Sequence, residues 1–354
     1  MSISAIMKTN GNNNNSIAEQ MVIGITMGDA GGIGPEIVVK ALADPEIRKA
    51  AKFIVFGMNE QLCYVADAAE IEPFWGRHQH EKINREYPYK VVVADYDEYS
   101  VPSWVRGPSK SAGEASMRFC VDAIDAARRG IVDAVVTAPI SKRSWKLAGS
   151  DWPGHTEMIA GQCKSKRKVM MFVAGPLKLA LATIHEALFD VRHKFTIGCV
   201  FEPIDLLNDA LKQYFDIDNP RIGVAALNPH AGENGQFGDE EQRIISPALL
   251  LAQEQGINCL GPFSADTLFL RAIEGEFDGV VAMYHDQGMI PVKLLDFERA
   301  VNVTIGIPIV RTSPAHGTAF DIAGRNIANP AGMKSAITTA ITMAKTKKNL
   351  EVRI

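Results

Sequence analysis

RIGVAALNPHAGENGQFGDEEQRIISPALLLAQEQ, residues 221–255, is the stretch that decides the fold class. It begins with a short apolar run at 221–227, continues through a Gly-rich polar loop that contains His230, and enters a segment of helical periodicity near Asp239. Short apolar runs bounded by turn residues are typical of buried strands, and a strand followed by a loop and a helix is the building unit of parallel sheets. The stretch therefore predicts one such unit of an α/β protein.

The same alternation is found outward from this unit. The earlier units are VIGIT (22–26) with a helical stretch from Pro35, KFIVFG (52–57) with a polar loop, and AVVTAP (134–139) with a helical stretch at 141–149. Residues 114–130 have an amphipathic helical pattern, and residues 330–348 predict a final amphipathic helix with a basic end. We therefore expect an α/β fold with largely parallel sheets.

Two segments depart from this alternation. Residues 72–99, rich in His, Arg, Tyr and Asp, are interpreted as an irregular insertion or an edge hairpin, and no chemistry is assigned to His78 or His80. Residues 1–20 hold a run of four asparagines and are expected to form a disordered tail.

The composition is that of an ordinary globular protein, and the length favours two lobes. The 354 residues are 47% hydrophobic and 22% charged, and the formal net charge of −4 argues against nucleic acid as a partner. No apolar run approaches the roughly 20 residues of a membrane span, and the N-terminus lacks the apolar stretch of a signal peptide. The five cysteines are scattered without a CxxC pair, so we expect a reducing, cytoplasmic location.

Three histidines each follow a strand-like apolar run: His185 after LKLALATI, His230 after RIGVAALNP, and His285 after FDGVVAMY. The carboxyl ends of parallel strands converge on one crevice, and neutral imidazoles with open positions suit a divalent cation that also binds substrate. The alternative is that each histidine only forms a hydrogen bond near a strand terminus, and the residue pattern alone leaves both interpretations open. Asp286 and Gln287 are candidate ligands or supporting partners.

Other candidates for anion binding have equally plain alternatives. His155 and Thr156 stand at a predicted helix start, which receives either an anion or an ordinary N-terminal cap. GDAGGIGPE, residues 28–36, is either a phosphate-binding turn or a tight turn that lines the crevice. Lys293, Asn302 and Arg311 suit a phosphate plus a carboxylate, with surface charge as the alternative for the lysine. Arg311 follows VTIGIPIV directly and is expected at a strand end.

The motifs occur in a characteristic order: GDAGGIGPE, TAPISK, PGHTE, the His185 strand, NPHAGE, YHDQGMIPVK and RTSPAHGTAFDIAG. With them the chain resembles the 4-hydroxythreonine-4-phosphate dehydrogenase family of vitamin B6 synthesis, from Val22 to about Gly332. NPHAGE and YHDQGMIPVK are specific to that family, whereas HGTAFDIAG is shared with the wider isocitrate and isopropylmalate dehydrogenase group.

The resemblance implies the two-lobed α/β/α fold of that wider group, and we place one lobe at 21–140 plus 297–354 and the other at 141–296. It implies a homodimer whose active sites lie near the subunit interface, NAD or NADP as the oxidant, and a divalent metal, with zinc favoured over cobalt or magnesium. The implied residues are His185, His230 and His285 for metal, His155, Thr156, Lys293, Asn302 and Arg311 for substrate, and His316, Gly317 and Asn329 for the dinucleotide.

The implied reaction is oxidation and decarboxylation of 4-hydroxythreonine 4-phosphate to 3-amino-2-oxopropyl phosphate. Three departures from the family pattern, at Ala30, after His185 and at Ser141, leave open D-threonate or D-erythronate 4-phosphate, which would give dihydroxyacetone phosphate. A metal-dependent hydrolase or lyase without nicotinamide, and a binding protein without catalysis, are the alternatives of other classes. The sequence identifies no general base.

Overall fold

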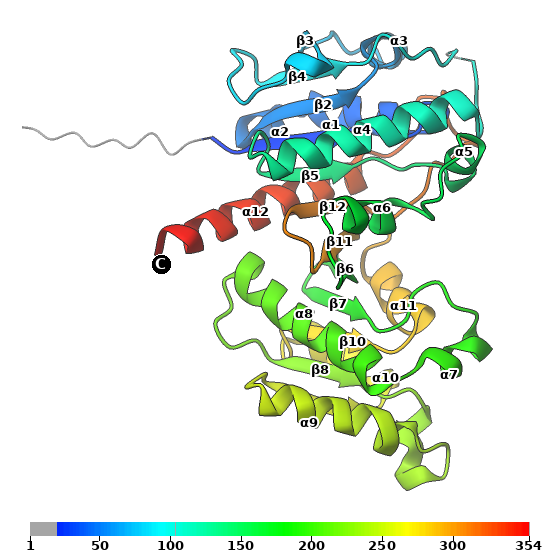
Figure 1. Ribbon diagram of the computed structural model, residues 1–354, viewed down its shortest axis with the longest axis vertical. Helices are drawn as coiled ribbons and strands as arrows, with labels where there is room; N and C mark the ends of the chain where they lie inside the picture. The colour runs from blue at the N-terminus through cyan, green and yellow to red at the C-terminus, as the bar shows by residue number, and fades with distance from the viewer. Residues whose placement is uncertain (1–19, 103, 354) are drawn as a thin grey trace, which may run out of the picture.

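The computed structural model describes residues 20–102 and 104–353, so the predicted tail at 1–20 lies almost wholly outside the described residues. The described part contains a single sheet of 12 strands in the order β3-β4-β2-β1-β5-β12-β11-β6-β7-β10-β8-β9 (Figure 1). The strands are β1 Val22–Thr26, β2 Lys52–Gly57, β3 Gly76–Gln79, β4 Val91–Asp95, β5 Ala134–Thr137, β6 Val169–Ala174, β7 Leu177–Leu181, β8 Ile222–Ala225, β9 Cys259–Phe263, β10 Gly279–Ala282, β11 Val301–Ile305 and β12 Val310–Pro314.

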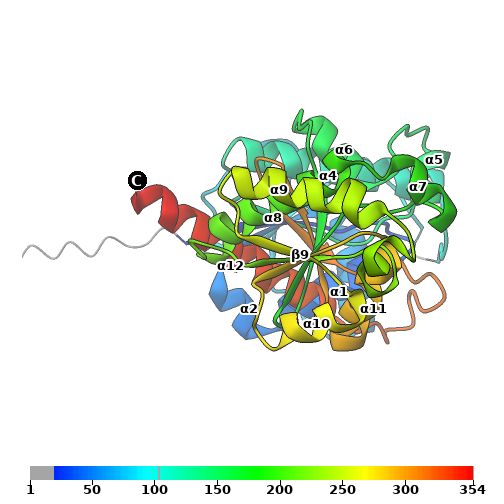
Figure 2. The ribbon, with the colours of Figure 1, turned by 90° about the horizontal axis from the view of Figure 1, so that it is seen from below.

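Helices cover both faces of the sheet. Figure 2 shows α4, α8 and α9 on one face and α1, α10 and α11 on the opposite face. The helices are α1 Gly34–Ala43, α2 Pro45–Ala50, α3 Asn59–Ala68, α4 Lys110–Arg128, α5 Lys142–Leu147, α6 His155–Gln162, α7 Val191–Lys194, α8 Ile197–Phe215, α9 Ser246–Glu254, α10 Ala265–Ile273, α11 His285–Asp296 and α12 Ala331–Arg353. None of them has the length and apolar character needed to cross a bilayer, within the residues that the structure describes.

The predicted α/β class with a largely parallel sheet is confirmed. Eight of the strand pairings are parallel, and the three antiparallel ones, β6 with β7, β6 with β11 and β11 with β12, lie together in the middle of the sheet. Parallel strands buried on both faces have continuous apolar sequences, which explains why β1, β4, β5, β8 and β10 are buried at every position.

Two local predictions are wrong. Residues 72–99, interpreted as an irregular insertion or an edge hairpin, instead contain the parallel pair β3 and β4, because the connection at 80–90 crosses over before β4 joins β3. The polar loop expected after β2 is helix α3, which buries Leu62 and Ala66 one turn apart, together with Gln61.

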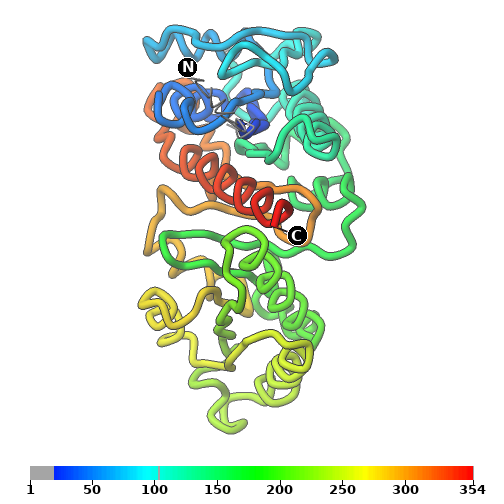
Figure 3. Tube along the Cα trace, turned by 90° about the vertical axis from the view of Figure 1, so that its left-hand side faces the viewer, coloured from blue at the N-terminus to red at the C-terminus, as the bar shows by residue number. Residues whose placement is uncertain are grey.

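The C-terminal helix α12 crosses the middle of the molecule and packs against both α8 and β12, as Figure 3 shows. One large core runs through most of the sheet, and a second core, which includes Phe172, Leu179 and Val292, lies beneath α10 and α11. Helices α5 and α6 both contact α4. The division into lobes at 140/141 and 296/297 stays a prediction.

The Gly-rich segment at 28–36 forms a closed turn that lies outside the lining of the central cavity. Gly28 has a φ of 76°, and a Cβ atom there would lie 2.4 Å from the carbonyl oxygen of Pro139. Gly32 packs equally tightly on Thr318. The glycines therefore allow the close backbone packing of a tight turn, but the segment does not line the cavity as that interpretation expected.

Candidate active site

A cavity of about 540 Å³ lies where β5, β12, β11 and β6 meet the N-termini of α6 and α11. Nine residues implied by the resemblance line it: His155, Thr156, His185, His285, Lys293, Asn302, Arg311, His316 and Gly317. They come from loops and strands far apart in the sequence and meet because the sheet places those elements side by side. His230 and Asn329 are outside this lining.

Arg311 is the most buried cation of the cavity, with 2% of its surface exposed. Its Nε and Nη2 donate to Thr137 Oγ1 at 3.2 and 2.6 Å, and its Nη1 donates to Thr304 Oγ1 at 3.1 Å. No carboxylate forms an ion pair with it among the described residues. Burial lowers the pKa of its guanidinium to about 10. A buried charge without a counter-charge favours an anionic ligand. Arg311 lies within β12, so its predicted place at a strand end is wrong.

The N-terminus of α6 adds uncharged donors to the same cavity. No side chain caps this helix, because its N-cap residue is Gly154, and His155 and Thr156 begin its first turn. Free backbone N–H groups at a helix N-terminus bind anions. Nε2 of His155 is buried without a partner in the described structure, and burial, together with the charge of Arg311, holds the pKa of this imidazole well below its ordinary value. His155 is therefore a neutral polar group that faces the cavity.

Lys293 and Asn302 complete the polar part of the lining. Lys293 Nζ donates to the carbonyl oxygen of Ala315 at 2.9 Å, and burial lowers its pKa. Oδ1 of Asn302 is buried and lacks a hydrogen-bond partner among the described residues. Unpaired buried polar atoms are rare in proteins, so their concentration here indicates a site for a polar ligand.

His185 and His285 lie beside each other at the cavity, with ring centroids 5.8 Å apart. His285 is the first residue of α11, and its Nδ1 lies 2.7 Å from Asp286 Oδ1. Burial, Lys142 and His285 lower the pKa of His185, which favours its neutral, metal-binding form. Gln287 instead bridges two backbone segments, accepting from the Met283 N–H and donating to the carbonyl oxygen of Ala226.

His230 lies in an exposed loop apart from this pair. Its Nδ1 is 3.2 Å from Glu233 Oε2. No group of three or more His, Cys, Asp or Glu side chains is close enough to hold a metal within a single described chain. A metal that uses all three histidines therefore needs a rearrangement or a second chain.

The donor chemistry nevertheless fits a divalent cation. Asp286 and Glu233 each accept at Nδ1 of their histidine, which leaves Nε2 of His285 and His230 able to bind a metal. The carboxylate partner also makes the imidazole a more basic ligand. His185 supplies a third imidazole beside His285.

The residues implied for the dinucleotide are less concentrated. His316 and Gly317 line the cavity, and Nδ1 of His316 is 3.1 Å from the carbonyl oxygen of Gly317. Burial lowers the pKa of His316. Asn329 is exposed, and its Oδ1 accepts from the N–H of Ala331 at the start of α12. Its side chain serves as a helix cap here.

Sequence reasoning gave no role to Lys142, Glu157 and Thr137, which also line the cavity. Lys142 and Glu157 both approach the backbone of Gly154, since a Cβ atom built there would lie 3.4 Å from one side chain and 3.6 Å from the other. Two signals were available: Lys142 follows the strand end TAPIS, and Glu157 stands in the first turn of the helix begun by His155.

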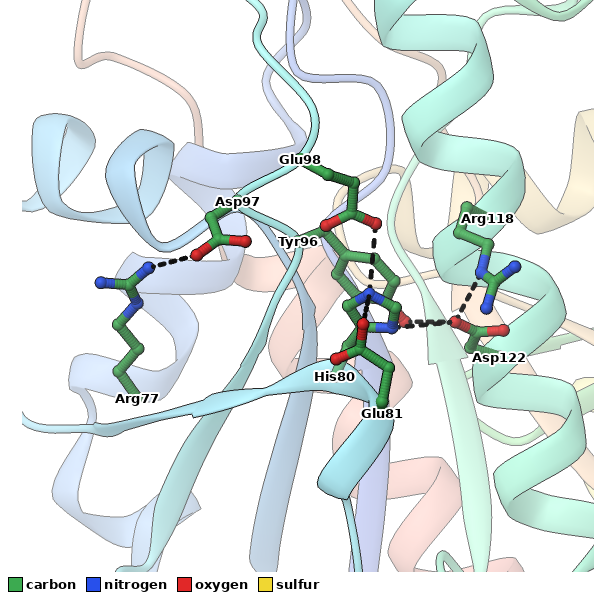
Figure 4. A network of polar contacts seen from close by, with 8 residues as sticks. All are labelled: Arg77, His80, Glu81, Tyr96, Asp97, Glu98, Arg118 and Asp122. Carbon is green, nitrogen blue, oxygen red and sulfur yellow. Dashed lines mark hydrogen bonds and ion pairs between the residues drawn. The ribbon is translucent and has the colours of Figure 1, made fainter.

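A second polar cluster lies near one edge of the sheet, beside β3 and β4 (Figure 4). His80 stacks on Tyr96 with ring centroids 4.0 Å apart, and its Nε2 is 3.1 Å from Glu98 Oε1. The Tyr96 hydroxyl and Arg118 both donate to Asp122 at 2.8 Å, and burial raises the pKa of Tyr96. These contacts fasten the connection after β3 and the end of β4 to α4, which is a structural role.

Comparisons with known proteins match this chain to one enzyme family along most of its length. The family described as Pyridoxal phosphate biosynthetic protein PdxA matches residues 49–340. A 4-hydroxythreonine-4-phosphate dehydrogenase of Geobacter metallireducens is 44% identical over 330 residues, which cover 91% of this chain and 95% of that protein. A relative from Oceanobacillus iheyensis, named for D-threonate 4-phosphate dehydrogenase, is 40% identical over 334 residues and covers 94% of this chain and 100% of its own.

The fold is similar to a solved structure as well. The crystal structure of a 4-hydroxythreonine-4-phosphate dehydrogenase from Klebsiella pneumoniae has a TM-score of 0.82 at 36% identity, and the match covers 92% of this chain and 99% of that one. The residues matched by the family include every residue that lines the cavity.

Proposed function

Because the chain belongs to the family of the pyridoxal phosphate biosynthetic protein PdxA, we propose that it oxidises and decarboxylates 4-hydroxythreonine 4-phosphate to 3-amino-2-oxopropyl phosphate in vitamin B6 synthesis. Its relatives are named as dehydrogenases, so the chain is an oxidoreductase, and the hydrolase, lyase and non-catalytic alternatives lose their support. The observation that carries the proposal is the buried charge of Arg311, which has no ion-pair partner among the described residues and shares a cavity with the pair His185 and His285.

The substrate carries two anionic groups, and the cavity offers matching donors. Arg311 and the N-terminus of α6 with Thr156 would bind one anion, and Lys293 would bind the other. Asn302 and His155 bring unpaired buried atoms that suit the hydroxyl and amino groups of the substrate. Held by several groups at once, the reacting carbon would be fixed in one orientation.

We propose that His185, His230 and His285 hold a divalent metal, with zinc favoured. The cation would supply stabilisation of the negative charge that develops on substrate oxygen during oxidation and decarboxylation. The chain's own part is to keep the imidazole of His185 neutral through burial and to orient the other two imidazoles through the carboxylates of Asp286 and Glu233.

NAD or NADP would bind beside His316 and Gly317, with Asn329 as a further contact, and would accept the hydride. His316 and Gly317 share the cavity lining with the proposed substrate residues, which would bring cofactor and substrate together. The burial that lowers the pKa of His316 favours its neutral imidazole, which would not repel the positive charge of an oxidised nicotinamide ring.

We also propose a homodimer, because it accounts for the position of His230. Helix α11 exposes 59% of Ile290, 83% of Leu294 and 67% of Phe297, at spacings that place them along one side of the helix that begins with His285. Apolar surface of this kind marks protein interfaces. A second chain seated there would bring its own His230 towards the pair. A cytoplasmic location is part of the same proposal, and the five free cysteines favour it.

Oxidation of D-threonate or D-erythronate 4-phosphate stays the alternative, since one relative is named for the former compound. The test is the formation of reduced nicotinamide by the purified, zinc-supplied protein with each of the three substrates. A strong preference for the amino compound supports the vitamin B6 assignment. Turnover of only an aldonate phosphate would keep the site and the chemistry but replace the substrate, and no turnover of any would contradict the proposal.

A further inference from the structure

The loop that carries His230 has an unusual backbone. Six consecutive residues, 230–235, have positive φ angles, between 43° and 94°, and only Gly232 and Gly235 among them are glycines. Left-handed conformations are unfavourable for residues with a Cβ atom and occur singly in most proteins. A run of this length persists only where the surroundings determine it. The loop therefore needs an anchor outside the turn itself.

Glu241 is that anchor. Only 3% of it is exposed, and it stands at the start of a π-helical turn, Glu241–Ile245, a rare form that is frequent at functional sites. Its Oε1 accepts from the backbone N–H groups of Leu227 and Asn228 at 2.9 and 2.7 Å, and its Oε2 accepts from Asn228 Nδ2 at 3.0 Å. All three partners are donors, which a carboxylate satisfies and a carboxamide does not.

The carboxylate also touches the turn directly. A Cβ atom at Gly232 would lie 2.7 Å from Glu241 Oε2 and 2.9 Å from the carbonyl oxygen of Gly238. Gly232 thus closes onto the anchor, while His230, two residues earlier, points outward with 67% of its side chain exposed. The loop is fixed at its base and presents its histidine at its surface.

We propose that Glu241 is the positioning residue of the His230 loop, which it holds in the left-handed conformation before any metal binds. Its effect on metal affinity rests on the proposed function, in which His230 is a ligand. The preformed loop lowers the ordering cost of binding, so loss of the anchor weakens metal binding without changing the ligand set.

The test uses four variants of the full chain. Glu241→Leu removes every acceptor at similar volume, and Glu241→Gln keeps one acceptor oxygen for the two backbone N–H groups. Glu240→Leu is the matched control, since Glu240 accepts only from the side chain of Asn228. His230→Ala reports what loss of the ligand itself does. The two measurements are amide hydrogen exchange at Leu227 and Asn228 in the metal-free protein, and titration with Co²⁺ followed by visible absorption.

We expect Glu241→Leu to speed exchange at both amides by about tenfold or more, because hydrogen bonds to charged groups are lost. Co²⁺ affinity should fall by about 10- to 100-fold, as it does when supporting partners of metal ligands are removed. The spectrum at saturation should match that of the unchanged protein, whereas His230→Ala should change it. Glu241→Gln should restore part of both losses, and Glu240→Leu should behave as the unchanged protein.

Unchanged exchange in Glu241→Leu, or an equal effect of Glu240→Leu, would overturn the proposal. So would unchanged Co²⁺ affinity in Glu241→Leu while His230→Ala weakens binding. If His230→Ala leaves Co²⁺ binding unaltered, the metal assignment of the proposed function fails, and the exchange measurement alone judges Glu241. Should Glu241→Leu not fold, Glu241→Gln and Gly232→Ala, whose added methyl group would press on the carboxylate, provide the same measurements.

Discussion

Nη2 of Arg311 donates to the hydroxyl of Thr137 at 2.6 Å, across the boundary between strands β12 and β5. Thr137 ends β5 and also lines the cavity, so the contact aims the guanidinium at the cavity from inside the sheet. Two threonine hydroxyls satisfy part of its donors but none of its charge. Burying this charge without an ion-pair partner destabilises the unliganded protein, and an anion bound in the cavity would supply the missing negative charge.

Replacing the charge of Arg311 should therefore weaken substrate binding without lowering the stability of the fold. Arg311→Met should lower kcat/KM by at least about a hundredfold, because an anion would lose its buried counter-charge. The free energy of unfolding without substrate should stay level or rise, since an unpaired buried charge has been removed. Steady-state kinetics and denaturant unfolding measure the two effects. Arg299→Met, at an exposed position, is the control, and a large loss of stability with intact kcat/KM would refute the assignment.

The protonation of His155 should make the folded protein less stable at acidic pH. Its pKa in the folded protein lies below the ordinary 6.5, chiefly because of burial, so the unfolded chain binds the proton more readily. The stabilising contribution is complete above about pH 6.5 and is lost as the pH falls from there towards the lower folded value.

His155→Asn should flatten this decline by up to about 1.4 kcal/mol per pH unit in the affected range. Denaturant unfolding of the metal-free protein from pH 7.5 to pH 5 measures the difference between the two slopes. His185 and His316 have pKa values lowered in the same direction and contribute equally to both proteins. Parallel curves would show that His155 does not titrate as its burial requires.

The apolar side of α11 should control assembly. Leu294→Glu places a charge where 83% of the side chain is exposed and where we propose that a second chain packs. Sedimentation should then find a monomer, and turnover should fall with it. Val352→Glu, at 82% exposure on α12, is matched in exposure and should leave a dimer. If the Leu294 variant is still a fully active dimer, the proposal that the second chain packs on α11 is wrong.

A site shared between two chains predicts complementation. His185→Ala and His230→Ala should each be inactive alone, but a mixed dimer has one site with His185 and His285 from one chain and His230 from the other. Co-refolding equal amounts should restore about a quarter of the activity, because half of the dimers are mixed and each has one intact site of two. If His230 serves its own chain, every site in the mixture lacks a ligand and no activity returns.

Much of the architecture was predictable because it depends on local patterns. Apolar runs of strand length alternate with helical periodicity, and their order alone leads to a largely parallel sheet with its loops at one edge. That the cavity lining includes His155, His185 and His285 follows from the same rule, since strand ends and helix starts gather there.

What the patterns missed depends on contacts between distant segments. The parallel pairing of β3 with β4 is set by a crossover, and its short polar strand has no clear period. Arg311 was expected at the end of a strand because the turn at 306–309 is apolar, so that β11 and the start of β12 have the sequence pattern of one continuous strand. The role of Glu241 depends on hydrogen bonds to residues 13 and 14 positions away, which no local spacing rule predicts.

The central claim is that this cavity is the active site of a metal-dependent dehydrogenase that uses His230. The most direct test follows reduced-nicotinamide absorbance with 4-hydroxythreonine 4-phosphate and NAD or NADP, for metal-free protein, for the same protein resupplied with zinc, and for His230→Ala with zinc. The account predicts turnover only in the second sample. Full turnover in chelator-treated protein or in the His230 variant would contradict it.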